Sequence, residues 1–171
     1  DTVALPNGEQ TIREYIVHPG ACMVIPLRAD GKVLLERQFR YPLHKTFVEF
    51  PAGKLDAGET LLACAQRELR EETGYVAAQH DWHYLAPIHN AIAYADEVIH
   101  LFLARNVADS GTPEPEGSEV WMSTFWAEPN ELLGWIRSGQ VTDVKTIIAA
   151  FWLEKIIHGH WLIAAPTSPA A

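Results

Sequence analysis

The chain has 171 residues, 48% of them hydrophobic, which suits one globular domain with a core of its own. Its formal net charge of −9 argues against a nucleic-acid-binding protein, because such proteins normally present a basic face. No apolar run approaches the length of a membrane span, so neither nucleic acid nor a membrane is expected as a partner.

The first fifty residues are predicted to form mainly β-strands. Pro19 with Gly20, and then Asp30 with Gly31, mark turns between runs that are rich in apolar and β-branched residues. The predicted strands are residues 11–17, 21–27, 32–39 and 46–50.

Residues 60–73 are predicted to form a helix, because the segment contains neither proline nor glycine. Gly74 follows it directly, at the position where a left-handed C-terminal cap favours glycine. On this helix Glu68, Glu71 and Glu72 stand at i, i+3 and i+4, so their side chains project from one face within a single turn.

Three carboxylates this close repel one another, and a hard divalent cation among them would lower that cost. Mg²⁺ prefers such oxygen ligands and keeps positions for substrate phosphates. The alternative for a lone acidic triplet is a solvent-exposed helix face on which Arg67 and Arg70 form ion pairs with the glutamates. The wider pattern favours the metal, because seven residue types at fixed spacing arise by chance on the order of 10⁻⁸ per starting position.

The second half of the chain alternates strands and helices. Predicted strands are residues 75–86, with an interruption at 79–81, then 98–104 and 120–126, and predicted helices are residues 129–138 and 143–158. Residues 89–97 and 109–119 are predicted loops, and 161–171 a flexible tail. Mixed strands with one helix in the middle of the chain and two at its end predict an α/β/α sandwich.

The two cysteines, Cys22 and Cys64, fall in a predicted apolar strand and on the predicted helix. In those places each is expected to be a small buried hydrophobic residue rather than half of a disulfide or a metal ligand. Free thiols of this kind suggest a reducing, cytoplasmic setting.

The stretch GKLDAGETLLACAQRELREETGY, residues 53–75, matches the Nudix box G-x5-E-x7-R-E-U-x-E-E-x-G-U at every specified position. The chain therefore resembles the Nudix hydrolases, which cleave a nucleoside diphosphate linked to another moiety with Mg²⁺ or Mn²⁺. The resemblance implies the Nudix α/β/α sandwich with a mixed β-sheet over residues 18–160. Residues 1–17 would add an N-terminal strand, expected to pair two subunits as a homodimer.

The flanks of the box are similar to those of ADP-ribose pyrophosphatases. The similar segments are HPGA at 18–21, RQFRYP at 37–42, VEFPAGKLDAGE at 48–59, ADEVIHLFLA at 95–104 and GQVTDVKT at 139–146. The resemblance implies hydrolysis of ADP-ribose to AMP and ribose 5-phosphate.

The same resemblance implies roles for particular residues. The backbone carbonyl of Ala52 and the carboxylates of Glu68, Glu71 and Glu72 match the metal ligands. Glu71 would complete the metal ligation by Glu68 and Glu72 or bridge the metals, and it counts among the catalytic residues for that reason. Glu97 matches the group commonly assigned as the base or as the residue that orients the attacking water.

Four further box residues, Gly53, Glu59, Arg67 and Gly74, are expected to be structural. For Glu59, pairing with Arg67 is favoured over metal ligation, because a carboxylate there also complements the helix dipole.

Arg40 and Glu49 are candidate substrate-binding residues. The guanidinium fork of Arg40 suits bidentate contact with phosphate oxygens, and a structural salt bridge is the alternative for it. For Glu49 the alternative is a surface position on a strand. Tyr15, Phe39 and Tyr41 could stack on a nucleobase, but burial or a subunit contact is favoured for each.

One position departs from the ADP-ribose pyrophosphatase pattern: Ile92 stands where those enzymes usually carry a proline that stiffens the loop. This departure keeps a second substrate class open, and a third function of a different kind is also considered. One is hydrolysis of another nucleotide sugar such as GDP-mannose, and the other is a non-catalytic nucleotide-binding sensor. Complete retention of the box glutamates and of Glu97 weighs against the sensor.

Overall fold

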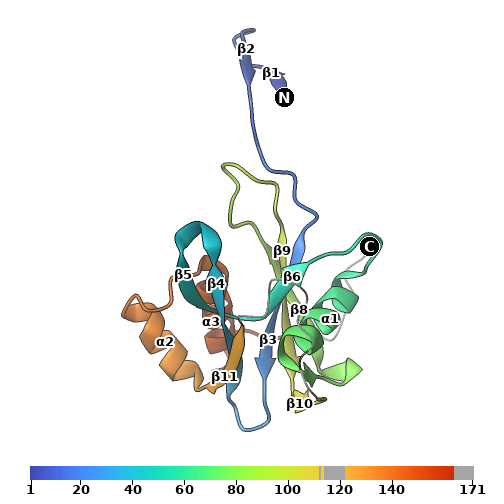
Figure 1. Ribbon diagram of the computed structural model, residues 1–171, viewed down its shortest axis with the longest axis vertical. Coiled ribbons are helices and arrows are strands. Elements are labelled where there is room, and N and C mark those ends of the chain that lie inside the picture. Colours follow the sequence, from blue (N-terminus) through green and yellow to red (C-terminus); the bar gives the residue numbers. More distant parts are fainter. Residues whose placement is uncertain (112, 114–121, 164–171) are drawn as a thin grey trace.

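The computed structural model describes residues 1–111, 113 and 122–163 (Figure 1). Most of the predicted exposed loop at 109–119, the start of the predicted strand 120–126 and residues 164–171 of the predicted tail 161–171 lie outside the described residues.

A mixed seven-stranded sheet forms the centre of the domain. Its strands in spatial order are β11 (Ser123–Ala127), β4 (Val33–Arg40), β3 (Ala21–Leu27), β9 (Ile99–Arg105) and β8 (Trp82–Ile88), with β5 (Lys45–Glu49) paired to β4 and β6 (Ala52–Lys54) paired to β3. Only β3 and β9 run parallel among these described pairs, and the other pairs are antiparallel.

In the described parts of the chain, three α-helices cover the two faces of the sheet. Helix α1 (Leu61–Thr73) lies on one side, and α2 (Pro129–Arg137) and α3 (Val144–Ile157) lie together on the other (Figure 1). Strand β3 explains the layering: Cys22 and Val24 pack into the core against α1, whereas Met23 and Ile25 pack into the core shared with α2 and α3. A strand buried on both faces needs the continuous apolar run that this segment carries.

The box helix begins and ends where its sequence predicts. The side chain of Thr60 accepts a hydrogen bond from the Ala63 N–H at 3.2 Å and caps the N-terminus. Gly74 takes φ = 73°, and its N–H donates to the Arg70 carbonyl at 2.8 Å. Glycine adopts this left-handed conformation without the steric cost that a side chain would add.

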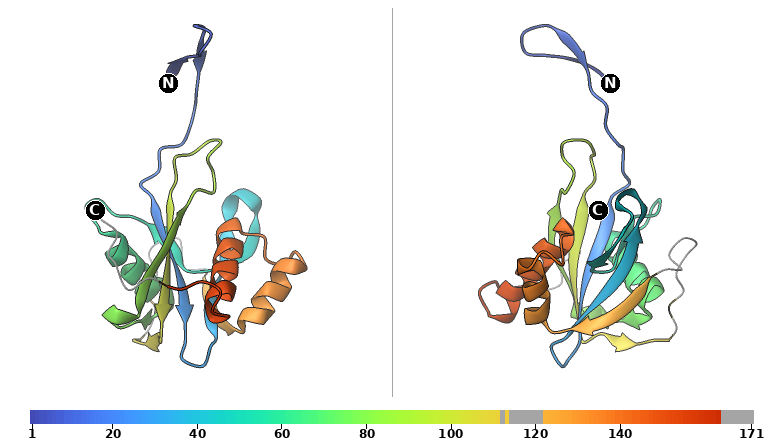
Figure 2. Two further views of the ribbon diagram at one scale, coloured as in Figure 1. Left: turned by 180° about the vertical axis from the view of Figure 1, so that it is seen from behind. Right: turned by 60° about the vertical axis from the view of Figure 1, so that its left-hand side comes forward.

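The N-terminal segment differs from the predicted strand at 11–17. Strand pairing stops at Ile12, and β1 (Thr2–Ala4) pairs with β2 (Gln10–Ile12) as a small hairpin that stands away from the domain (Figure 2). Beyond it, within the part of the chain that the structure describes, only Ile16 makes a bridge, to Ala95. The β-rich composition of 11–17 was misleading because, among the described residues, no further strand continues the β1–β2 pairing past Ile12.

The predicted strand 75–86 is divided. It comprises the short strand β7 (Tyr75–Val76), which pairs with β10 (Ala108–Asp109), then the 3₁₀ turn η2 (Gln79–Asp81) and finally β8. A second 3₁₀ turn, η1 (Tyr41–Leu43), joins β4 to β5. Strand β6 was not predicted, because three residues within a Gly- and Pro-containing loop carry no periodic signal.

Both cysteines are buried and free. Among the described residues, no helix is long and apolar enough to cross a membrane.

Candidate functional site

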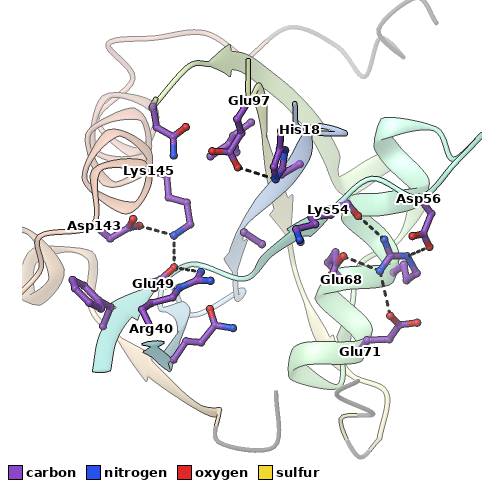
Figure 3. A pocket seen from close by; sticks show the side chains of 18 of the residues that line it. His18, Arg40, Glu49, Lys54, Asp56, Glu68, Glu71, Glu97, Asp143 and Lys145 are labelled. Carbon is purple, nitrogen blue, oxygen red and sulfur yellow. Dashed lines mark hydrogen bonds and ion pairs between the residues drawn. The ribbon is translucent and has the colours of Figure 1, made fainter. Parts of the chain in front are cut away.

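A pocket of about 690 Å³ opens where strands β3 to β6 meet the box helix, the 89–97 loop and the start of α3 (Figure 3). It brings together most of the residues proposed from the sequence. They are Arg40, Glu49, Ala52, Gly53, Arg67, Glu68, Glu71 and Glu97.

The first wall of the pocket is formed by the box helix and strand β6, which touch closely. A Cβ on Gly53 would lie 1.9 Å from a carboxylate oxygen of Glu68, so only glycine leaves room for that carboxylate. The Ala52 N–H donates a hydrogen bond to Glu72 at 3.0 Å. Glu68 and Glu72 are both buried, and the Ala52–Gly53 backbone lies directly against them.

Arg67 ties this wall together through its whole guanidinium group. Its Nε and Nη2 each lie 3.0 Å from an oxygen of Glu59, and Nη2 also donates to the Lys54 carbonyl at 3.0 Å. Its Nη1 donates to Glu68 at 2.7 Å and to Glu71 at 3.4 Å. The hydrogen bond with Glu59 raises the pKa of Arg67 and lowers the pKa of Glu59, so both groups stay charged at neutral pH.

These residues suit a hard divalent cation by two criteria. Their donor atoms are carboxylate and backbone oxygens, the ligands that Mg²⁺ prefers. In addition, the missing side chain at Gly53 opens the space in which the Glu68 carboxylate lies. As arranged, no group of three or more His, Cys, Asp or Glu side chains in the described parts of the chain is placed to hold a metal ion. Arg67 and the Ala52 N–H instead bind the glutamates.

The second wall carries a buried network of charges that begins with Glu49, only 2% exposed. Its carboxylate pairs with Arg40, whose Nε and Nη2 donate at 2.8 and 2.6 Å, and also with the ammonium group of Lys145. Lys145 in turn lies 2.9 Å from Asp143, which caps the N-terminus of α3. Burial raises the pKa of Glu49, but the Arg40 hydrogen bond and the charges of Lys145 and Arg40 outweigh burial and leave the pKa below its usual value.

This network changes the roles that were predicted for Arg40 and Glu49 as substrate-binding residues. The fork of Arg40 already holds Glu49, which leaves Nη1 as the amino group not engaged with that carboxylate. Glu49 is a core residue of the pocket wall and not a surface strand position. Tyr15, Phe39 and Tyr41 are exposed and do not line this pocket, whereas Phe47 and Leu43 do.

The third wall is the 89–97 loop with the turn that precedes β3. Glu97 lines the pocket, and its Oε1 lies 3.5 Å from Nε2 of His18 (Figure 3). Ile92, on the same loop, is 80% exposed and is not among the residues that line the pocket.

Sequence reasoning missed several polar residues of the pocket. They are His18, Gln38, Lys54, Asp56, Asn90, Asp143 and Lys145. Lys145 could have been found, because it is a lone cation in the first turn of a helix that is otherwise almost wholly apolar. Such a side chain points to a buried partner.

Known proteins resemble this chain along most of its length. The family model of the NUDIX domain matches residues 17–147. The chain is 37% identical over 154 residues to the methanol dehydrogenase activator of Bacillus methanolicus, and 35% identical over 154 residues to the ADP-ribose pyrophosphatase of Bacillus subtilis. Each alignment covers 90% of this chain and 82% of the relative.

Among solved structures, the crystal structure of an ADP compounds hydrolase superposes with a TM-score of 0.79 at 20% sequence identity. The match covers 93% of this chain and 84% of that one, which confirms the predicted fold class.

Proposed function

This chain belongs to the NUDIX family, and we propose that it is a pyrophosphohydrolase that cleaves ADP-ribose to AMP and ribose 5-phosphate. The observation that supports this function best is the pocket itself. On one wall it holds the box carboxylates of Glu68 and Glu71 next to the Ala52–Gly53 backbone, and on the facing wall it holds Arg40 and Lys145. The 35% identity to an ADP-ribose pyrophosphatase over most of both chains favours this substrate.

The reaction adds water across a phosphoanhydride bond. The oxygen of water forms a bond to one phosphorus, the bond from that phosphorus to the bridging oxygen breaks, and the bridging oxygen leaves on the other phosphate. The water protons pass to a base and finally to solvent. Negative charge on the diphosphate opposes the attack, so the site must neutralise charge as well as supply the base.

The box wall supplies the means to neutralise charge. Glu68, Glu71, Glu72 and the Ala52 carbonyl would hold a divalent cation, most simply Mg²⁺ with Mn²⁺ as substitute. A bound cation of this kind would neutralise diphosphate charge as a Lewis acid. Arg67 orients these carboxylates through its bonds to Glu68 and Glu71 and is anchored in turn by Glu59.

The facing wall binds the substrate's polar groups. Nη1 of Arg40 is the cationic edge offered to a phosphate or to a ribose hydroxyl, because Glu49 fixes the rest of the guanidinium group. Glu49 thereby acts by holding Arg40. Lys145 adds positive charge beside it.

Glu97 is proposed to position and deprotonate the attacking water. It reaches the pocket from the 89–97 loop, on a different wall from the box helix. A base on a separate element can approach the water from the side away from the metal ligands. It is also free of Arg67, which binds the box glutamates.

A second substrate class, another nucleotide sugar such as GDP-mannose, is favoured by the 89–97 loop. That loop carries an exposed Ile92 in place of the proline usual in ADP-ribose pyrophosphatases, so its backbone is less restricted. A sensor without activity is the third candidate.

A substrate screen tests these alternatives. Phosphate products would be measured with ADP-ribose, ADP-glucose, GDP-mannose, NADH and diadenosine polyphosphates, each with and without Mg²⁺. We expect ADP-ribose to give the highest kcat/KM and no turnover without a divalent ion. A higher kcat/KM with GDP-mannose would make a mannose nucleotide, and not ADP-ribose, the proposed substrate. Absence of turnover on every compound, with binding retained, would favour the non-catalytic sensor.

The assembly is proposed to be a homodimer formed through the N-terminal extension. Ile12, Ile16 and Val17 are 58–75% exposed, and the β1–β2 hairpin that ends at Ile12 stands away from the domain (Figure 2). A second copy would cover them. Sedimentation equilibrium of the full chain should give a dimer mass.

Because Cys22 and Cys64 are free and buried, we place the protein in the cytoplasm.

A further inference from the structure

The His18 ring has one nitrogen committed to the local backbone and the other directed at the site. The Gly20 N–H donates a hydrogen bond to Nδ1 at 3.1 Å. Because Nδ1 accepts, the proton of the neutral ring is on Nε2. Nε2 lies 3.5 Å from Oε1 of Glu97, and the two side chains are 17% and 21% exposed. The pocket thus contains an N–H donor that faces the proposed base.

The backbone around His18 holds it against the Glu97 loop. The His18 N–H donates to the carboxylate of Asp96 at 2.7 Å. Two residues earlier in the chain, the Ile16 N–H donates to the Tyr94 carbonyl at 2.8 Å, and the Asp96 N–H donates to the Ile16 carbonyl at 3.2 Å. The segment before β3 and the end of the loop therefore form one short parallel ladder, and the distance between His18 and Glu97 does not depend on side-chain contact alone.

The turn at 18–20 also touches the entrance of the box. The Gly20 carbonyl accepts a hydrogen bond from the Leu55 N–H at 3.1 Å, and the Ala21 N–H donates to the Val98 carbonyl at 2.9 Å. Gly20 has φ = +90°, a conformation that side chains rarely adopt. The turn thus connects the strand that follows Glu97 with the strand that contains Gly53.

We propose that His18 is a positioning residue for Glu97, an inference that rests on the proposed function of Glu97. The terminal torsion of a glutamate is broad, so a carboxylate without a fixed partner samples many orientations. The Nε2–H of His18 holds one carboxylate oxygen and leaves the other to accept a proton from water. The 3.5 Å separation is of the kind that shortens when a substrate completes the site.

Substituting His18 by asparagine or by glutamine separates the two functions of its ring, which are acceptance from the Gly20 N–H at Nδ1 and donation toward Glu97 at Nε2. The asparagine side chain places an oxygen where Nδ1 lies and accepts from the Gly20 N–H as an Asx turn, but it is too short to reach Glu97. The glutamine side chain places an amide N–H2 where Nε2 lies. H18N therefore keeps the turn and loses the contact with Glu97, whereas H18Q keeps a donor toward Glu97.

The test is steady-state hydrolysis of ADP-ribose with saturating Mg²⁺. Removing a group that orients a catalytic residue costs roughly 10- to 100-fold, and we expect H18N to lower kcat by this factor with little change in KM or in Tm. H18Q should recover part of the loss. The matched control is H80N, because His80 is 83% exposed in η2, outside the pocket. This control should behave as the wild type.

A double-mutant cycle with E97Q decides whether the effect passes through Glu97. If it does, H18N lowers kcat in the wild-type background and does not lower it further in the E97Q background. The inference is overturned if H18N keeps the wild-type kcat, if its cost is the same in both backgrounds, or if E97Q itself is fully active. A wild-type protein that hydrolyses none of the diphosphates tested would overturn the proposed function instead.

Discussion

Replacing Lys145 by methionine tests the buried charge network most directly. The side chain of Lys145 is 10% exposed and that of its partner Glu49 is 2% exposed. Removing one member of a buried ion pair typically costs 3–5 kcal/mol, because the other charge stays buried without compensation. Glu49 keeps Arg40 as a partner, so we expect the free energy of unfolding to fall by about 2–4 kcal/mol. In a chain of this size each kcal/mol lowers Tm by roughly 2–4 °C.

The measurement is urea unfolding at pH 7, followed through the fluorescence of the six tryptophans. K155M is the matched control, since Lys155 lies on the same helix but is 39% exposed and pairs with Glu154 at the surface. Such a pair contributes about 0–1 kcal/mol. Equal losses of unfolding free energy in K145M and K155M would refute the view that Lys145 compensates a buried charge.

The pH dependence gives an independent check on the same pair. The native pKa of Glu49 lies below its usual 4.5, so its ion pairs stabilise the fold above pH 4.5, and this stability is lost as the pH falls through the lowered native pKa. K145M removes one of the charges that lower the pKa. The difference in unfolding free energy between wild type and K145M should therefore shrink as the solution is acidified below pH 4.5. A difference that grows in acid would contradict this account.

Three further substitutions address the box and the base. E72Q should lower kcat by orders of magnitude with an unchanged circular dichroism spectrum, and near-normal activity would mean that the metal lies elsewhere. E97Q should lower kcat by roughly 100-fold or more with a modest change in KM, as expected for a general base; unchanged constants would place the base elsewhere on the loop. G53A should abolish most activity and lower Tm, because its Cβ would meet Glu68 at 1.9 Å. Gly134, with open space around it, provides the control G134A, which should be fully active.

Local patterns were sufficient for the elements that carry their own signal. The box helix could be bounded from its cap residues, and β3 (Ala21–Leu27) was predicted to the residue because a continuous apolar run of that length suits a strand buried on both faces. The N-terminal strand was extended too far, since strand pairing depends on a neighbour that composition does not reveal. The three glutamates were placed on one helix face by their spacing alone.

What the sequence determined by itself is the chemistry of one wall, because residues three and four apart on a helix are neighbours in any fold. The facing walls were decided by tertiary structure. Lys145 meets Glu49 across 96 residues, and His18 reaches Glu97 through the ladder that joins the chain before β3 to the 89–97 loop. Such contacts depend on how the sheet orders its strands and where α3 docks. Neither the strand order nor the docking position of α3 can be predicted from the sequence spacing of the residues in contact.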